Sequence, residues 1–513
     1  MALLRFAPSP TGSLHLGGLR TALYNHIYAK KLGGRWLLRI EDTDATRFVP
    51  EAVDGIKSVL SWAGLEYDFG PGKGGPQSPF FQSQRLDLYH AYAKKLLDSG
   101  HAYRCFCTPD QLSVKRERLA RSGSKSTYDK TCLHLTEEEV ARRVRAGEKS
   151  VIRLNDGETP PRAAITDIVF GPIKYSDAGI STDPILLKSD LFPTYHLASV
   201  VDDHEMGITH VLRGEEWLPS LPLHLDLYAC LSVKPPQYGH LPILLNPDGT
   251  KMSKRKGDVQ VSDYIKRGWE PAAVLNWLAL VGWGTHHSVS SSPLSSPSSS
   301  SESFSTSRID NAPDSTQIMT LPEIIDQFEL SSLTHRRNAL DLTKLEYLNK
   351  HHLLRMSSTH EGLESLARRI YLLYTSIEDI MNVILTLESR PTTVNDIPAL
   401  APFFFVDPDL ASEEARSMIA PFSTLDRQQT LEAILRRLEQ FSNEGSWDLL
   451  SISDMLKEEN ARLGLKSKVF NTVLRHALTG MKQGPSVPKT MTTLGTHRTL
   501  VRLRTAHSAT MTI

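Results

Sequence analysis

Residues 8–18 read PSPTGSLHLGG and lie between an apolar run at residues 3–7 and an amphipathic run that begins at Leu19. Proline and glycine interrupt regular structure in residues 8–18, whereas apolar side chains recur at helical spacing after them. The order therefore predicts a strand, a loop and a helix. Two glycines at residues 33–34 end that helix before a second apolar strand at residues 35–40. The first forty residues thus predict a β-α-β unit of a parallel sheet.

Polar residues follow both predicted strands, at the edge where open α/β sheets bind ligands. His15, Gly17 and Gly18 stand at the start of the predicted helix, and Glu41 follows the second strand. A helix N-terminus offers unpaired N–H groups, and glycine lets a ligand approach the backbone, so phosphates of a nucleotide fit there beside His15. The alternative is a tight turn that carries a surface histidine. The unit has neither a GxGxxG nor a P-loop pattern.

A second polar loop occupies residues 245–257 and reads LNPDGTKMSKRKG. Asn-Pro-Asp-Gly demands a turn, and four cations follow within the six residues 251–256. Cations this close repel one another unless water screens their charges or an anion such as polyphosphate lies among them. A solvated basic loop or a localisation tract is the alternative for such a run on its own. The first motif, more than 200 residues upstream, favours polyphosphate.

Together the two motifs resemble the ATP-binding signatures of class I aminoacyl-tRNA synthetases, and their surroundings resemble a glutamyl-tRNA synthetase of bacterial or organellar type. Residues 187–204, LKSDLFPTYHLASVVDDH, and residues 211–217, VLRGEEW, also carry the resemblance. It is specific in these stretches and in the two motifs, and looser after residue 360. It implies an α/β Rossmann-type catalytic domain with an inserted domain for the tRNA acceptor end, followed by an α-helical anticodon-binding domain.

The resemblance also implies domain boundaries. We expect the first half of the catalytic domain at residues 1–98, the acceptor-end domain at 99–196, the second catalytic half at 197–235, the second motif and a stem-contact region at 236–355, and the anticodon-binding domain at 356–513. Helical spacing of apolar residues at 425–438 and at 499–504 agrees with the last of these.

Site residues follow from the same resemblance. The guanidinium groups of Arg5 and Arg213 can each bind a carboxylate through two hydrogen bonds, and Glu41 can accept hydrogen bonds from the substrate ammonium. A plain ion pair between Arg5 and Glu41 is the alternative. The family often has histidine where Gly18 stands, so this chain departs from the family's pattern at one phosphate contact. The resemblance assigns glutamate binding to Arg5, Ala7, Ser9, Glu41, Tyr195 and Arg213, ATP binding to His15, Gly17, Gly18, Glu216, Lys251, Met252, Ser253, Lys254 and Arg255, and catalysis to His15, Lys251 and Lys254.

The implied reaction joins L-glutamate to the 3′ end of tRNA(Glu) through a glutamyl-adenylate, with ATP and Mg²⁺. Charging of tRNA(Gln) as well is an open alternative. Glutaminyl-tRNA synthetase is the enzymatic alternative, which Arg213 disfavours because an uncharged amide leaves that cation unpaired. A catalytically inactive tRNA-binding relative is the third possibility, and the intact motifs argue against it.

Three of the four cysteines lie close together in the sequence. Cys105 and Cys107 form a CxC, and Cys132 and His134 form a CxH after a gap of 24 residues. Three thiolates and an imidazole make a tetrahedral ligand set for structural Zn²⁺. Some bacterial members of the family bind zinc here and others do not. Buried cysteines without a metal are the alternative.

Composition sets further bounds. The chain has 58 basic and 58 acidic residues, so any RNA contact must come from local basic surface. No apolar run approaches the ~20 residues that cross a bilayer, and we expect no membrane association and a monomer.

Residues 288–307 contain 13 serines, which predicts a disordered insert. An insert in a bacterial-type enzyme suggests the mitochondrial matrix, although no transit peptide is visible; the cytoplasm is the alternative.

Overall fold

The computed structural model describes residues 1–44, 46–173, 182–246, 248–250, 260–283, 316–370, 376–444 and 446–511. The chain forms two compact units, one of Met1–Ile265 with Val274–Lys344 and the other of Lys266–Ala273 with Leu345–Ile513. The cationic loop at residues 251–256 and the predicted disordered insert at 288–307 lie outside the described residues. No described helix is both long and apolar enough to cross a bilayer.

A parallel sheet forms the centre of the first unit. Its strand order is β2-β1-β8-β9, with β1 at Leu3–Phe6, β2 at Arg35–Leu38, β8 at His210–Gly214 and β9 at Gln237–Leu241. Helix α1, Leu16–Lys31, connects β1 to β2, so the predicted β-α-β unit is confirmed. The edge strand β9 extends this sheet past residue 235, where the resemblance had placed the end of the second catalytic half.

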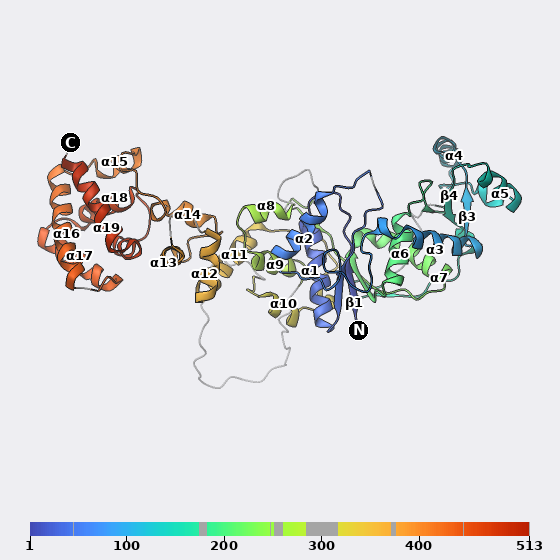
Figure 1. The fold of residues 1–513 in the computed structure, drawn as a ribbon, viewed down its shortest axis with the longest axis horizontal. Coiled ribbons are helices and arrows are strands. Elements are labelled where there is room, and N and C mark those ends of the chain that lie inside the picture. The colour runs from blue at the N-terminus through green and yellow to red at the C-terminus, as the bar shows by residue number, and fades with distance from the viewer. Residues whose placement is uncertain are drawn as a thin grey trace, which may run out of the picture. The chain divides into compact units, whose positions relative to one another are not determined.

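Helices cover both faces of the parallel sheet (Figure 1). Helix α1 lies on one side of β1 with α2, Glu51–Trp62. On the other side, α3 (Leu86–Asp98), α6 (Tyr195–Glu205) and α7 (Leu221–Cys230) share one core with the sheet. Sheet residues Leu37 and Val211 and helix residues Leu197 and Leu221 are fully buried in that core. Burial on both faces explains why the strands are short apolar runs without alternation.

Residues between α3 and α6 form separate antiparallel structure. One sheet has the order β3-β4-β7, with strands at Ala102–Cys105, Val151–Leu154 and Ile185–Leu187. The helices of this region are α4, Pro109–Arg121, and α5, Glu137–Arg145. A small hairpin of β5, Thr166–Asp167, and β6, Gly171–Pro172, returns to the parallel sheet, where Ile168 N donates to Tyr238 O at 2.8 Å.

The remaining elements are mostly helical. Two short strands, β10 and β11, pair in parallel. The bounds are β10 Leu244–Leu245, β11 Asn338–Ala339, α8 Val261–Lys266, α9 Pro271–Leu280, α10 Leu321–Gln327, α11 Leu342–Ser357, α12 His360–Ile370, α13 Ile377–Leu387, α14 Asp396–Leu400, α15 Glu413–Ile419, α16 Thr424–Glu444, α17 Leu449–Leu463, α18 Ser467–Thr479 and α19 Val487–Met511.

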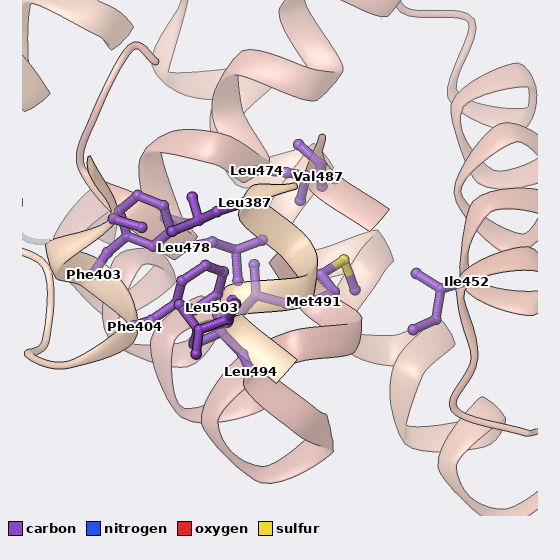
Figure 2. Close-up of a cluster of buried hydrophobic side chains, with 14 of the residues drawn as sticks. Leu387, Phe403, Phe404, Ile452, Leu474, Leu478, Val487, Met491, Leu494 and Leu503 are labelled. Atoms are coloured by element: carbon purple, nitrogen blue, oxygen red, sulfur yellow. The ribbon is translucent and has the colours of Figure 1, made fainter. Parts of the chain in front are cut away.

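The helical unit has its own apolar core, drawn in Figure 2. Leu478, Met491 and Leu503 are fully buried and point toward the same interior. Gly495 interrupts α19 with φ of 72°, which lets the residues on either side of the break reach that core. The predicted apolar face of residues 425–438 is confirmed from Leu431 onward, because Leu431, Ile434 and Leu438 of α16 are buried there, whereas Leu425 is 60% exposed.

Candidate active site at the carboxyl ends of the parallel strands

A cavity of about 500 Å³ opens at the carboxyl ends of β1, β2 and β8. Its walls come from the loop after β1, the start of α1, the residue Glu41 beyond β2, the start of α6 and the end of β8. Parallel strands bring these distant segments to one edge of the sheet. The structure thereby assembles around one cavity every predicted substrate residue that it describes: Arg5, Ala7, Ser9, His15, Gly17, Gly18, Glu41, Tyr195, Arg213 and Glu216.

His15 caps the N-terminus of α1. Its Nδ1 accepts a hydrogen bond from Gly18 N at 3.0 Å. The neutral ring then carries its proton on Nε2, which makes that nitrogen a donor for a bound anion. A side chain at Gly18 would place its Cβ 2.6 Å from Leu14 Cδ1, so the missing family histidine would have to displace Leu14.

Arg5 and Glu41 belong to a buried ion network rather than to an ion pair with each other. Arg5 Nε lies 3.1 Å from Asp203 Oδ1, and Arg39 Nη1 lies 2.7 Å from the same oxygen. Glu41 Oε1 accepts from Arg39 Nη2 at 3.2 Å. Burial raises the pKa of Glu41, against the opposing effect of the two guanidinium groups. The alternative of a plain pair between Arg5 and Glu41 is therefore wrong: each has another partner, and both face the cavity.

Arg213 is buried to the same extent as Arg5 but is surrounded by neutral acceptors. Its Nε donates to His240 Nε2 at 3.0 Å, and its Nη1 lies 3.2 Å from Tyr195 Oη and 3.3 Å from His224 Nδ1. Its Nη2 donates to the carbonyl of Trp217 at 3.3 Å. In the described part of the chain, no carboxylate forms an ion pair with this guanidinium. Arg213 is thus a buried cation at the cavity wall whose direct hydrogen-bond partners among the described residues are all neutral.

Two further cavity residues take part in this architecture. Gly214 leaves room for the Glu216 carboxylate, because a Cβ at that position would lie 2.1 Å from Glu216 Oε2. Arg20 was not among the sequence predictions; its Nη1 donates to Pro242 O at 2.8 Å and its Nη2 to Val281 O at 2.8 Å. The only sequence signal for Arg20 was a cation between apolar residues near the start of α1.

The thiols of Cys105, Cys107 and Cys132 meet at the end of β3. Their sulfur atoms all lie within 4.8 Å of one another, with 3.6 Å between Cys107 and Cys132. Two thiolates bound to one tetrahedral zinc ion are ~3.8 Å apart, given Zn–S bonds of ~2.3 Å, so the trio fits such an ion. Hydrogen bonds from Cys132 and Tyr128 lower the pKa of Cys105 to about 4, despite its burial.

The fourth group beside the thiols is Tyr128 and not the predicted His134. Tyr128 Oη lies 3.4 Å from Cys105 Sγ and 3.7 Å from Cys107 Sγ, and it accepts from Cys132 N at 3.2 Å. His134 is exposed, and its ring is not part of the group. The short helical turn Thr131–His134 directs Cys132 inward and leaves the side chain two residues later on the surface.

Comparison with known proteins places the chain in a family. Residues 2–346 match the family described as tRNA synthetases class I (E and Q), catalytic domain, and residues 358–507 match the anticodon binding domain family. The glutamate–tRNA ligase of Chloroherpeton thalassium is 36% identical over 98% of this chain and 97% of its own length. That of Clostridioides difficile is 36% identical over 98% of both chains.

Solved structures agree with the sequence relatives. A crystal structure of the glutamate tRNA ligase from Elizabethkingia meningosepticum, in complex with its amino acid, has a TM-score of 0.79 and 31% identity, and the match covers 99% of each chain. The enzyme from Elizabethkingia anophelis has a TM-score of 0.76 with the same coverage. The chain therefore belongs to the class I aminoacyl-tRNA synthetases, in the glutamyl-tRNA synthetase family of bacterial type.

Proposed function

We propose that this chain ligates L-glutamate to the 3′ end of tRNA(Glu), consuming ATP and passing through a glutamyl-adenylate. The observation that carries this proposal is Arg213, a buried guanidinium that lines the cavity and has only neutral protein partners among the described residues. A buried cation is stable only when an anion pairs with it. The side-chain carboxylate of glutamate supplies that anion, whereas the amide of glutamine does not.

Other residues of the cavity wall suit the amino-acid end of the substrate. Glu41 is an acceptor for the substrate ammonium, and Arg5 is held by Asp203 with its guanidinium at the cavity surface. Arg5, Arg213 and Glu41 together offer two cations and one carboxylate, which match the charges of glutamate, a substrate with two carboxylates and one ammonium. Tyr195, whose hydroxyl lies beside Arg213, packs its ring 4.2 Å from that of Trp217 and closes this side.

The chemistry requires alignment and charge stabilisation, and no enzyme nucleophile. The α-carboxylate of glutamate attacks the α-phosphorus of ATP, and pyrophosphate leaves. His15, fixed by its bond to Gly18, donates from Nε2 to the phosphates at the N-terminus of α1. Lys251 and Lys254 add cationic charge to the phosphoryl group as charge builds there. Mg²⁺ bound to the ATP neutralises part of the polyphosphate charge. A terminal ribose hydroxyl of the tRNA then attacks the adenylate carbonyl, and AMP leaves.

Aminoacylation with purified components tests the activity. The chain is incubated with ATP and either glutamate or glutamine, in the presence of tRNA(Glu) or tRNA(Gln) separately. Glutamate on tRNA(Glu) is the expected product, and it must require ATP. Glutamine on tRNA(Gln) would indicate glutaminyl-tRNA synthetase, and tRNA binding without any product would indicate an inactive relative. Glutamate on tRNA(Gln) as well would identify a non-discriminating enzyme.

A structural zinc ion accompanies this function in our proposal. The thiols of Cys105, Cys107 and Cys132 and the Tyr128 hydroxyl form the four-donor group that supports it. These donors tie the strand end after β3 to the turn at residues 131–134, which would stabilise the region between α3 and α6. Elemental analysis of the purified protein is expected to find about one zinc per chain.

Location and assembly complete the proposal. A serine-rich insert in a bacterial-type enzyme supports the mitochondrial matrix as the compartment, and we propose that the enzyme acts there as a monomer. Protease protection of the tagged protein in isolated mitochondria tests the compartment, and light scattering on the purified protein tests the monomer. Uniform distribution in the cytoplasm, or twice the monomer mass, would contradict these two statements respectively.

A further inference from the structure

Arg213 is hydrogen-bonded to a buried imidazole, which is in turn hydrogen-bonded to a buried carboxylate. Asp167 Oδ2 lies 2.7 Å from His240 Nδ1, and His240 Nε2 accepts from Arg213 Nε at 3.0 Å. Asp167 is 1% exposed and His240 is completely buried. Neither residue lines the cavity, whereas Arg213 does. The two therefore act on a bound substrate only through Arg213.

Both oxygens of the Asp167 carboxylate accept hydrogen bonds from described residues. Its Oδ1 accepts from the amides of Val169 and Phe170, each at 2.9 Å, and both its oxygens are near His240 N. Burial alone would raise its pKa, but these bonds and the bond from the His240 ring lower it below the ordinary value. Asp167 is consequently an ionised acceptor at the end of strand β5, where its Oδ1 binds the amides of the turn that follows.

An ionised Asp167 determines which nitrogen of His240 carries the proton. Burial lowers the pKa of His240 more than the bond to Asp167 raises it, so the ring is neutral. Its single N–H is then on Nδ1, where it donates to Asp167, and Nε2 is a bare acceptor. With the proton on Nε2, two N–H donors would face each other across the 3.0 Å to Arg213 Nε.

The bond to His240 is the shortest of the four that hold Arg213, since the other three are 3.2–3.3 Å long. It holds Nε, the one guanidinium nitrogen with a single hydrogen, and together with the bonds from Nη1 and Nη2 it fixes the plane of the guanidinium that lines the cavity. A planar guanidinium recognises a carboxylate by its orientation as well as its charge.

We propose that Asp167 and His240 are positioning residues for glutamate selectivity: they fix the guanidinium of Arg213 in the orientation that grips the side-chain carboxylate. This inference rests on the proposed function, because it takes glutamate as the ligand of Arg213. Selectivity for glutamate then depends on a carboxylate from the segment between α3 and α6 and on an edge strand of the catalytic sheet. Neither lay in the stretches that carry the family resemblance.

Two substitutions at His240 separate positioning from packing. In His240→Asn the amide nitrogen overlies Nδ1 and can still donate to Asp167, but nothing reaches Arg213. In His240→Gln the amide oxygen overlies Nε2 and can accept from Arg213. We expect His240→Asn to raise the KM for glutamate about 10–100-fold, with smaller changes in kcat and in the KM for ATP, and to lower the glutamate-to-glutamine preference. The KM for glutamate of the His240→Gln variant should stay within about 5-fold of that of the unchanged protein.

Asp167→Asn is a second, independent variant of nearly identical shape. Its amide donates to Nδ1, places the His240 proton on Nε2 and should reproduce the His240→Asn phenotype in kinetics of the folded protein. Equal losses in His240→Asn and His240→Gln, or losses shared by glutamate, glutamine and ATP alike, would overturn the inference. So would an Asp167→Asn variant with wild-type kinetics.

Arg213→Gln, measured in parallel, distinguishes this inference from the proposed function. If Arg213→Gln leaves the KM for glutamate unchanged, the glutamate pocket itself is wrongly assigned. If Arg213→Gln loses glutamate selectivity while His240→Asn and Asp167→Asn retain it, the pocket stands and only the positioning role fails.

Discussion

Arg5 and Asp203, 198 positions apart in the chain, form a buried ion pair with 3.1 Å between Nε and Oδ1. Arg213, equally buried at the same cavity, has no such partner among the described residues. The protein therefore balances one arginine by its own acid and leaves the other for the ligand. Because an unpaired buried charge is costly, the binding of a carboxylate relieves a cost at Arg213 that does not exist at Arg5.

Arg213→Gln should reduce kcat/KM for glutamate by about 10²–10³ or more, because removal of one partner of a desolvated ion pair costs roughly 3–5 kcal/mol. Glutamine should lose much less, since an amide facing an amide leaves no buried charge. Steady-state aminoacylation with each amino acid measures both values. Equal losses would mean that Arg213 holds the shared α-carboxylate or ATP.

Lys254→Ala should slow the formation of the adenylate far more than it weakens ATP binding. Loss of one cation that stabilises the transition state costs on the order of 10²–10³ in rate, or about 3–4 kcal/mol. Single-turnover kinetics measures the activation step directly. Lys256→Ala is the matched control, since it removes a cation of the same loop to which the family resemblance assigns no contact. Near-normal turnover in Lys254→Ala would remove this loop from the catalytic machinery.

The thiol cluster gives a prediction about metal content. Cys132→Ser should release the zinc and weaken the region between α3 and α6, since structural zinc contributes directly to folding. Tyr128→Phe should lower the zinc affinity, because the hydroxyl lies 3.4 Å from Cys105 Sγ, whereas His134→Ala should retain the metal. Zinc titration with a chelator measures these affinities. Loss of zinc in His134→Ala alone would restore the histidine predicted from the sequence.

His196 predicts a fall in stability on acidification. Burial, and then the charge of Arg213, lower the pKa of His196 to about 4, whereas an unfolded histidine titrates near 6.5. Between these pH values the unfolded chain binds one more proton than the folded chain. The contribution of neutral His196 to the free energy of unfolding is therefore complete above pH 6.5 and is lost as the pH falls toward 4. The loss is about 2 kcal/mol between pH 7.5 and 5.

Urea unfolding at the two pH values measures this effect. His196→Gln should lose less stability on acidification than the unchanged protein. His204→Gln, on the exposed face of the same helix α6, should follow the unchanged protein. An identical pH dependence in all three proteins would mean that His196 does not remain neutral in the folded state.

Leu503→Ala should destabilise the helical unit by about 2–5 kcal/mol, because it removes a fully buried side chain from the core shown in Figure 2. Val501→Ala in the same helix α19 is the control. Val501 is 46% exposed, and its truncation should change stability by less than about 0.5 kcal/mol. Thermal unfolding of both variants provides the comparison, and similar melting temperatures would show that this core position is not tightly packed.

Local sequence determined the elements on which the cavity is built. Apolar spacing and the glycines at 33–34 were sufficient for β1, α1 and β2, because burial selects these patterns independently of distant residues. The same reasoning found the apolar face of α16. The grouping of Arg5, Tyr195 and Arg213 came from resemblance, and the structure explains it because the carboxyl ends of β1 and β8 meet at one edge of the sheet beside the start of α6.

Tertiary structure alone decided how the charged and polar side chains pair. Arg5 pairs with Asp203 and not with Glu41, Tyr128 joins the thiols in place of His134, and Asp167 reaches Arg213 through His240. Each of these pairings depends on which side chains are buried next to each other in the folded chain. Sequence patterns report the period of an element and the side that it buries, but the partner of a buried charge depends on distances across the fold.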